Sequence, residues 1–178
     1  GQGIRAARTL IRKGWIGRPT DASIQVSVNT PWDMWPWLAA QERLEILYHS
    51  IHYLDAIRSL FGDPVWITSR HTRYPLQGVV RGETKTVTIL DYADDMQAMV
   101  ADNHYNLSDD YFAVFRFIGT EGVITGTLGA MYNYPHGPPD TLEWSRKRHY
   151  PDKRFEAKLE GQWIPDSFIG PTASLMQA

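Results

Sequence analysis

The chain contains no cysteine among its 178 residues. This absence excludes a disulfide scaffold, a thiol nucleophile and any cysteine-ligated metal. No apolar run approaches the ~18 residues that a membrane-spanning helix needs, and no secretory signal pattern is present. The formal net charge of −2 provides no basic footprint for nucleic acid or an anionic membrane. These absences predict a cytoplasmic protein that binds neither nucleic acid nor membrane.

The common nucleotide and hydrolase fingerprints are also missing. No GxGxxG follows a predicted strand, and neither a P-loop nor a GxSxG elbow occurs. We therefore expect that this chain by itself does not hold a nucleotide in the usual way. The sequence begins with Gly1 rather than Met and runs almost directly into a helical pattern. We interpret residues 1–178 as a single domain cut from a longer protein.

Helical patterns come first and strand patterns dominate afterwards. Residues 4–13 and 45–62 have helical periodicity, and a further helix is predicted to begin near Phe168. Alternation and β-branched residues predict strands at 22–29, 65–73, 84–92, 96–104, 111–118, 123–131 and 141–147. Short turns between consecutive strands indicate antiparallel pairing. We predict an α+β fold with an open, largely antiparallel sheet of about six strands and helices on one face.

The other face of this sheet needs a second cover. Apolar residues occur on both faces of the strand at 111–118, with Phe115 and Phe117 on one side and Phe112 and Val114 on the other. A second copy of the chain is the cover that we expect. The sequence therefore predicts a homo-oligomer through the sheet face that carries either Phe112 and Val114 or Phe115 and Phe117.

The helix at 45–62 carries two distinct patterns. An apolar stripe that we expect to be buried consists of Leu47, Ile51, Leu54, Ile57 and Phe61. Another face aligns Tyr48, His52, Asp55 and Ser59, with His49 beside them. An imidazole titrates near neutral pH and can carry a proton, so His52 is the candidate catalytic residue. Asp55 or Tyr48 would fix its tautomer. The alternative is a solvated helix face without chemistry.

Three tryptophans lie close together before this helix, at Trp32, Trp35 and Trp37. They either cover the end of the core or an oligomer contact, or form the wall of a site for a flat or sugar-like ligand.

A metal site is a further alternative. Glu45, His49 and His52 are spaced i, i+4 and i+7 and could present ligands from one helix face. No distant fourth ligand stands out among His71, His104, His136 and His149, and we predict no metal.

Three segments resemble the C-terminal domain of the Gfo/Idh/MocA oxidoreductases, the family of glucose–fructose oxidoreductase and inositol dehydrogenase. Residues 4–19 resemble the opening of that domain. Residues 50–55, followed by 60–64, resemble its histidine-containing helix and the Gly-x-Pro after it. The turn at 117–122 resembles its GTEG hairpin. The order and spacing of the three agree across residues 4–125.

The resemblance implies a function that the residues alone do not give. Members carry an N-terminal Rossmann domain that binds NAD or NADP, whereas the C-terminal domain builds the substrate pocket and the oligomer interface. They move a hydride between nicotinamide and a sugar or polyol. The family histidine maps onto His52, while the Asp that many members carry four residues earlier is replaced by Tyr48.

The resemblance thus implies a small-molecule substrate, with His49 and the three tryptophans as candidate substrate-binding residues. The isolated chain is expected to be inactive without the cofactor domain. A relative that kept the sheet but lost the site, acting as a binding or assembly module, is the alternative.

Overall fold

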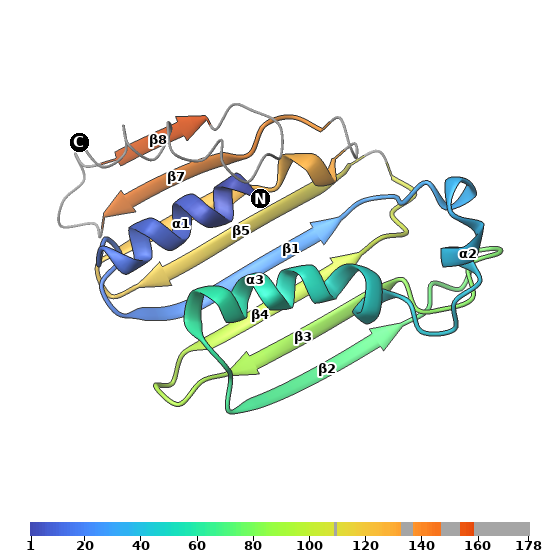
Figure 1. Cartoon of the computed structure of the whole chain (residues 1–178), viewed down its shortest axis with the longest axis horizontal. Helices are drawn as coiled ribbons and strands as arrows, with labels where there is room; N and C mark the ends of the chain where they lie inside the picture. The colour runs from blue at the N-terminus through green and yellow to red at the C-terminus, as the bar shows by residue number, and fades with distance from the viewer. Residues whose placement is uncertain (109, 133–136, 147–153, 159–178) are drawn as a thin grey trace. The chain divides into compact units, whose positions relative to one another are not determined.

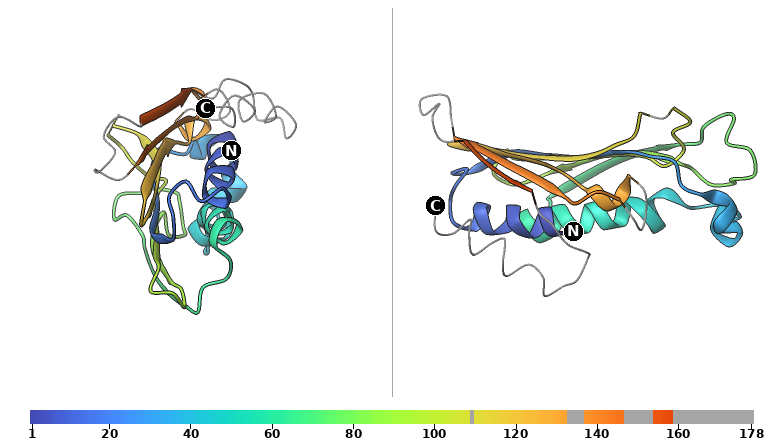
Figure 2. Two further views of the ribbon diagram at one scale, coloured as in Figure 1. Left: turned by 90° about the vertical axis from the view of Figure 1, so that its left-hand side faces the viewer. Right: turned by 90° about the horizontal axis from the view of Figure 1, so that it is seen from above.

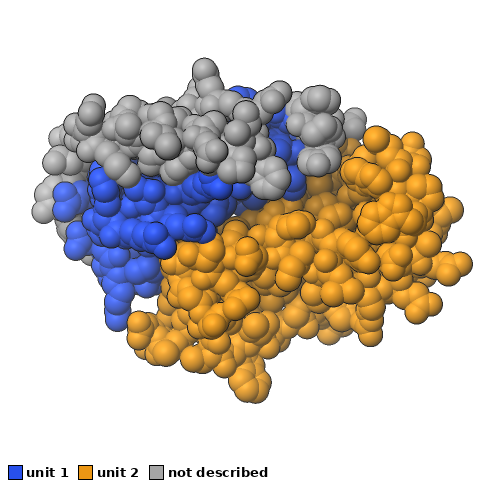
Figure 3. Space-filling model, in the orientation of Figure 1, with its two compact units in different colours: residues 1–22, 114–178 blue, residues 23–113 orange. Residues whose placement is uncertain are grey.

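The computed structural model describes residues 1–108, 110–132, 137–146 and 154–158, the last as backbone only (Figure 1). The chain divides into two compact units, one of residues 1–22 with 114–178 and one of residues 23–113 (Figure 3). Strand β1 (Pro19–Ser27) begins in the first unit and ends in the second. The polar helix face and the three tryptophans all belong to the second unit, so the candidate site lies within one unit.

The second unit has the strand order β2-β3-β4-β1. Its other strands are β2 (Trp66–Thr72), β3 (Lys85–Asp91) and β4 (Gln97–Asn103). The pairs β2/β3 and β3/β4 are antiparallel. The predicted hairpin at 84–104 is confirmed, and its turn places Asp95 at φ +58°.

In the first unit the order continues from β1 through β5-β6-β7-β8. These strands are β5 (Phe112–Gly119), β6 (Gly122–Thr127), β7 (Thr141–Arg146) and β8 (Arg154–Lys158), and consecutive ones pair antiparallel. The predicted α+β class with an open, mostly antiparallel sheet is confirmed, with eight strands in the described residues rather than about six. Strand β8 was not expected from the sequence.

Helix α1 (Gln2–Arg12) covers one face of the first unit (Figure 2). It buries Ile4, Ala6, Ala7 and Leu10, and Phe115 and Phe117 of β5 are buried on the same side. A Cβ on Gly3 would lie 3.0 Å from the Phe115 ring, so the helix sits directly on that side chain. The expectation that Phe115 and Phe117 form an oligomer face is therefore wrong, because α1 already covers them.

The GTEG turn between β5 and β6 is tied to the segment after α1. The amides of Thr120 and Glu121 donate to the carbonyls of Arg18 and Ile16, at 2.9 and 2.8 Å. A Cβ on Gly119 would lie 2.2 Å from the Ile16 carbonyl oxygen. Only glycine allows this close backbone approach.

In the second unit the buried face of the sheet packs under helix α3 (Ile51–Phe61) (Figures 1 and 2). Inward side chains alternate along each strand as the sequence predicted. They are Ile24, Val26 and Val28 near β1, Thr86, Thr88 and Leu90 on β3, and Ala98, Val100 and Asp102 on β4. The hydroxyls of Ser50 and Thr86 lie 2.7 Å apart and link the start of the helix to β3.

The predicted apolar stripe of this helix is largely wrong. Of its five members only Ile57 is buried, whereas Leu47 and Ile51 are 60% and 46% exposed. Ser50, Tyr53 and Ile57 face the core instead. Residues 46–50 form a π-helical turn before α3, and such a turn carries more residues than an α-turn. The preceding side chains are therefore rotated away from the positions that a uniform 3.6-residue period predicts.

Helix α3 ends where the sequence indicated. Gly62 follows with φ +86° and its amide bonds the carbonyl of Arg58 at 2.8 Å, which is the behaviour of a glycine after a helix C-terminus. The helix expected near Phe168 lies outside the described residues. Within the described part, no helix is long and apolar enough to cross a membrane.

Candidate functional site

The exposed face of α3 carries the predicted catalytic residues. His52 and Asp55 are both exposed, and neither makes a hydrogen bond to the other within the part of the chain that the structure describes. Tyr48 is half-buried in the preceding π turn and makes an edge-type contact with Trp37, with the ring centroids 5.8 Å apart. The structure thus places His52 in contact with solvent, while Tyr48 packs on an aromatic neighbour.

The three tryptophans separate into two environments. Trp32 is buried and Trp35 is partly buried, and both belong to a small core with Leu38, Ala39, Leu44 and Val80. These residues come from the 3-10 turn Trp32–Met34, helix α2 (Pro36–Ala39) and the loops beside them. Trp37 is 57% exposed. Trp32 and Trp35 therefore cover part of the core, which was one of the two alternatives for these residues. Of the three tryptophans, only Trp37 has a broad surface open to a ligand.

A buried polar cluster lies beneath the π turn. Glu45 is fully buried, and its Oε1 lies 2.6 Å from His104 Nδ1 while its Oε2 lies 3.1 Å from His49 Nδ1. The two imidazole rings stack with centroids 3.9 Å apart and planes 15° apart. A fully buried carboxylate is costly without such partners.

The sequence indicates only part of this cluster. The i, i+4 spacing of Glu45 and His49 was visible, whereas His104 stood out only as a distant histidine. A signal for it did exist, because inward positions on β4 alternate at 98, 100 and 102, and the same alternation continued to 104 faces the same core. His104 has 4% exposure.

The electrostatics of the cluster follow from burial and mutual charge. Burial alone would raise the pKa of Glu45, but the charge and hydrogen bond of His104, with the hydrogen bond of His49, lower the pKa below its ordinary value. Burial and the nearby His104 lower the pKa of His49. Glu45 is therefore ionised and His49 neutral at pH 7.

Two further titratable groups adjoin the cluster. Asp102 is 4% exposed, and burial raises its pKa to about 7. Its Oδ1 has no hydrogen-bond partner within the described residues. The rings of Tyr53 and His104 are stacked with centroids 6.4 Å apart, and burial raises the pKa of Tyr53 as well. Both groups favour their neutral forms.

Glu45, His49 and His104 are the group within the described residues whose potential ligand atoms lie within 4.8 Å of one another. This set differs from the possible ligand set considered from the sequence, in which His52 took the place of His104. A bound ion sits ~2.0–2.1 Å from an imidazole nitrogen and close to the ring plane. Two nearly parallel rings 3.9 Å apart cannot both direct such a nitrogen at one ion. The arrangement is that of a hydrogen-bonded network.

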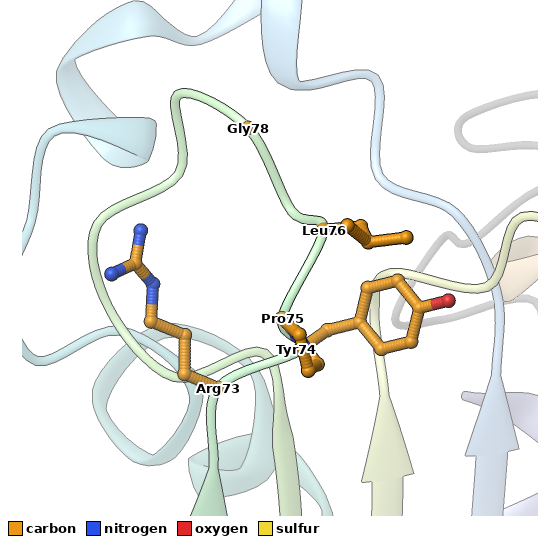
Figure 4. Close-up of a pocket in the computed structure, with 5 residues that line it drawn as sticks. All are labelled: Arg73, Tyr74, Pro75, Leu76 and Gly78. Atoms are coloured by element: carbon orange, nitrogen blue, oxygen red, sulfur yellow. The ribbon is translucent and has the colours of Figure 1, made fainter.

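An open pocket of about 440 Å³ lies at the loop that follows β2. Arg73, Tyr74, Pro75, Leu76 and Gly78 line it, and Figure 4 shows the side chains of Arg73 and Tyr74 directed to different sides of the loop. Arg73 donates to the carbonyl of Val80 at 3.1 Å. Its guanidinium is thus used to hold the loop, and none of the residues of the polar cluster lines this pocket.

The described residues do not fit the pyrophosphate of a dinucleotide. The amide of Gly3 at the start of α1 already donates to the Asp140 carboxylate at 2.8 Å, so an acidic side chain occupies the position where a phosphate would bind. Helix α3 continues directly from the π turn and has no free N-terminal turn.

The family model of the GFO/IDH/MocA C-terminal domain matches residues 4–125. The chain belongs to this family. The matched range contains the π turn, α3, His104 and the GTEG turn, so the resemblance of residues 4–125 to this domain is confirmed.

Several solved structures share the fold of this GFO/IDH/MocA domain. An oxidoreductase from Agrobacterium radiobacter in complex with NAD+, L-tartaric acid and magnesium has a TM-score of 0.75 and 22% identity over 99% of this chain and 49% of its own. An inositol dehydrogenase homolog from Azotobacter vinelandii complexed with NADH and myo-inositol has a TM-score of 0.70 and 13% identity, over 94% of this chain and 42% of its own.

A levoglucosan dehydrogenase in complex with NADH and L-sorbose has a TM-score of 0.66 and 18% identity, over 90% of this chain and 46% of its own. This GFO/IDH/MocA chain therefore spans less than half the length of each of these structures. No curated protein matches the sequence.

Proposed function

We propose that residues 1–178 form the substrate-binding and oligomerisation domain of an NAD(P)-dependent oxidoreductase that acts on a sugar- or polyol-like substrate. The observation that carries the proposal is His52, an exposed imidazole on the helix of the matched family domain. The structural relatives support it, since their names pair NAD+ or NADH with L-tartaric acid, myo-inositol or L-sorbose.

A nicotinamide held by a part of the protein outside this chain would accept or donate the hydride. Oxidation of a secondary alcohol also releases the proton of its hydroxyl group. His52 takes that proton through a ring nitrogen and returns it in the reverse direction. Asp55, one turn further along the same exposed face, and Tyr48 are the polar neighbours that we assign to this step. The exposed indole of Trp37 packs against the apolar face of the substrate ring, and His49 binds a hydroxyl group.

One observation favours a second candidate, a binding or assembly module without chemistry. Tyr48 stands where many members of the family carry Asp, and it packs against Trp37. A site that has lost this carboxylate has also lost one means of orienting its histidine.

The full-length protein distinguishes the two candidates. In the oxidative direction, the reduction of NAD+ or NADP+ is followed by nicotinamide absorbance with myo-inositol, L-tartrate and related polyols as substrates. In the reductive direction, the oxidation of NADH or NADPH is followed with L-sorbose and related sugars. We expect His52→Gln to lower kcat about 10²- to 10⁴-fold, which is the usual contribution of general acid–base catalysis. His71→Gln is the matched control, because His71 is an exposed histidine of β2 that contacts Arg43 at 3.3 Å. Unchanged turnover in His52→Gln refutes the catalytic assignment. The absence of nicotinamide-dependent turnover with every substrate supports the binding module.

A further inference from the structure

The carboxylate of Glu45 bridges two stacked histidines at the base of the proposed site. Each carboxylate oxygen forms a hydrogen bond with a different ring. Oε1 lies 2.6 Å from Nδ1 of His104, and Oε2 lies 3.1 Å from Nδ1 of His49. Glu45 is the residue before the π turn and His104 is the residue after β4, so the bridge joins the helix to the sheet.

An ionised carboxylate accepts hydrogen bonds and donates none. Both imidazole Nδ1 atoms must therefore carry a proton. A neutral imidazole has one protonated nitrogen, which leaves Nε2 of His49 as an acceptor. Within the described residues this Nε2 makes no hydrogen bond, and the His49 side chain keeps 15% of its exposure.

We propose that Glu45 and His104 are positioning residues that hold His49 in its Nδ1-protonated tautomer and thereby present Nε2 as a hydrogen-bond acceptor for a hydroxyl group of the substrate. The tautomer follows from this chain alone. The identification of the acceptor's partner as a substrate hydroxyl rests on the proposed function.

The ring of His49 is held by two aromatic contacts as well as by the hydrogen bond at Nδ1. His104 stacks on it with ring centroids 3.9 Å apart, and Trp32 makes an edge-type contact with ring centroids 6.0 Å apart. Turning the imidazole over would break the bond to Glu45 and disturb both contacts. The packing therefore specifies the direction of Nε2 in addition to its protonation.

His104 has a second role, which is to keep Glu45 ionised. A buried carboxyl group readily takes up a proton, and a protonated Glu45 could donate to His49 and reverse its tautomer. The other titratable groups that face the cluster, Asp102 on β4 and Tyr53 on α3, carry no positive charge. His104 donates the shorter of the two hydrogen bonds to Glu45, at 2.6 Å, and a hydrogen bond donated to a carboxylate favours its ionised form.

The first test is a direct measurement of the tautomer in the full-length protein at pH 7.5. Nitrogen NMR of histidine-labelled protein separates protonated from unprotonated ring nitrogens, and the His49→Gln variant identifies the resonances of His49. We expect a protonated Nδ1 and an unprotonated Nε2. A wild-type His49 with its proton on Nε2 overturns the proposal, and this outcome requires no variant of the cluster to fold.

The second test compares Glu45→Gln and His104→Gln with Thr88→Val. Thr88 is a buried residue of β3 whose hydroxyl bonds Ser69 at 2.8 Å, away from the cluster, and it controls for the loss of a buried hydrogen bond. A glutamine amide cannot accept from both rings, so one histidine must change tautomer in Glu45→Gln. We expect a KM for the hydroxylated substrate about 10-fold higher in both cluster variants, with kcat changed less than KM and Thr88→Val like the wild type.

The positioning role is overturned if both rings keep their tautomers in Glu45→Gln, or if KM rises equally in Thr88→Val. The proposed function fails separately. If His52→Gln retains full turnover while His49 carries its proton on Nδ1, the catalytic assignment is wrong and the positioning of His49 stands.

Discussion

The Asp102→Asn substitution should remove a pH-dependent loss of stability. Asp102 is 4% exposed, its Oδ1 has no partner within the described residues, and its contact from the Thr86 hydroxyl is long at 3.4 Å. Burial is the largest influence and raises its pKa from 3.8 to about 7. Asparagine imitates the neutral acid in shape but cannot ionise.

The sign follows from linkage between protonation and folding. Between pH 3.8 and about 7 the unfolded chain has an ionised Asp102 and the folded chain a neutral one, so folding binds a proton. The stabilisation from the raised pKa is complete below pH 3.8 and is lost as the pH rises to about 7. At about 1.4 kcal/mol per pH unit, the full loss is about 4 kcal/mol.

The measurement is the free energy of unfolding of the 178-residue chain in urea, at several pH values from 4 to 8. We expect Asp102→Asn to gain up to about 4 kcal/mol relative to wild type as the pH rises through this range. Asp91→Asn is the control, because Asp91 lies at the other end of the neighbouring strand β3 and is accessible to solvent. A difference between Asp102→Asn and wild type that does not change with pH would refute the argument.

Two further predictions test the helix register and the sheet face. Ile57→Ala should lower the free energy of unfolding by about 2–5 kcal/mol because Ile57 is fully buried, whereas Leu47→Ala should change it by less than about 0.5 kcal/mol; equal effects in urea unfolding would restore the stripe expected from the sequence. Phe112→Glu, at a side chain 37% exposed on the face of β5 opposite Phe115 and Phe117, should shift the full-length protein to a smaller species in sedimentation velocity. Lys13→Glu, at an exposed position directly after α1 and away from that face, serves as the charge control. An unchanged sedimentation coefficient in Phe112→Glu would count against this face as the oligomer contact.

Local patterns were sufficient for most of the fold. Alternation in β1, β3 and β4 and the short turns between the later strands predicted an open antiparallel sheet, because a period of two needs no knowledge of distant residues. The GTEG turn was also visible, although the close packing of Gly119 on Ile16 required the structure. The helix was harder, since the π turn at 46–50 has no simple sequence signal and changes which side chains meet the core.

The candidate site shows where a local pattern is insufficient. The sequence shows Glu45 and His49 only as an i, i+4 pair on a helix, and such a pair on a protein surface would be solvated. What changes its meaning is His104, which lies 59 residues away from Glu45 and reaches it because β4 runs beneath the start of the helix. The pairing buries the carboxylate, fixes two tautomers and leaves one imidazole nitrogen of His49 as an acceptor. A sequence pattern can suggest a proton carrier such as His52, but the orientation of its neighbour depends on a contact between helix and sheet that only the fold provides.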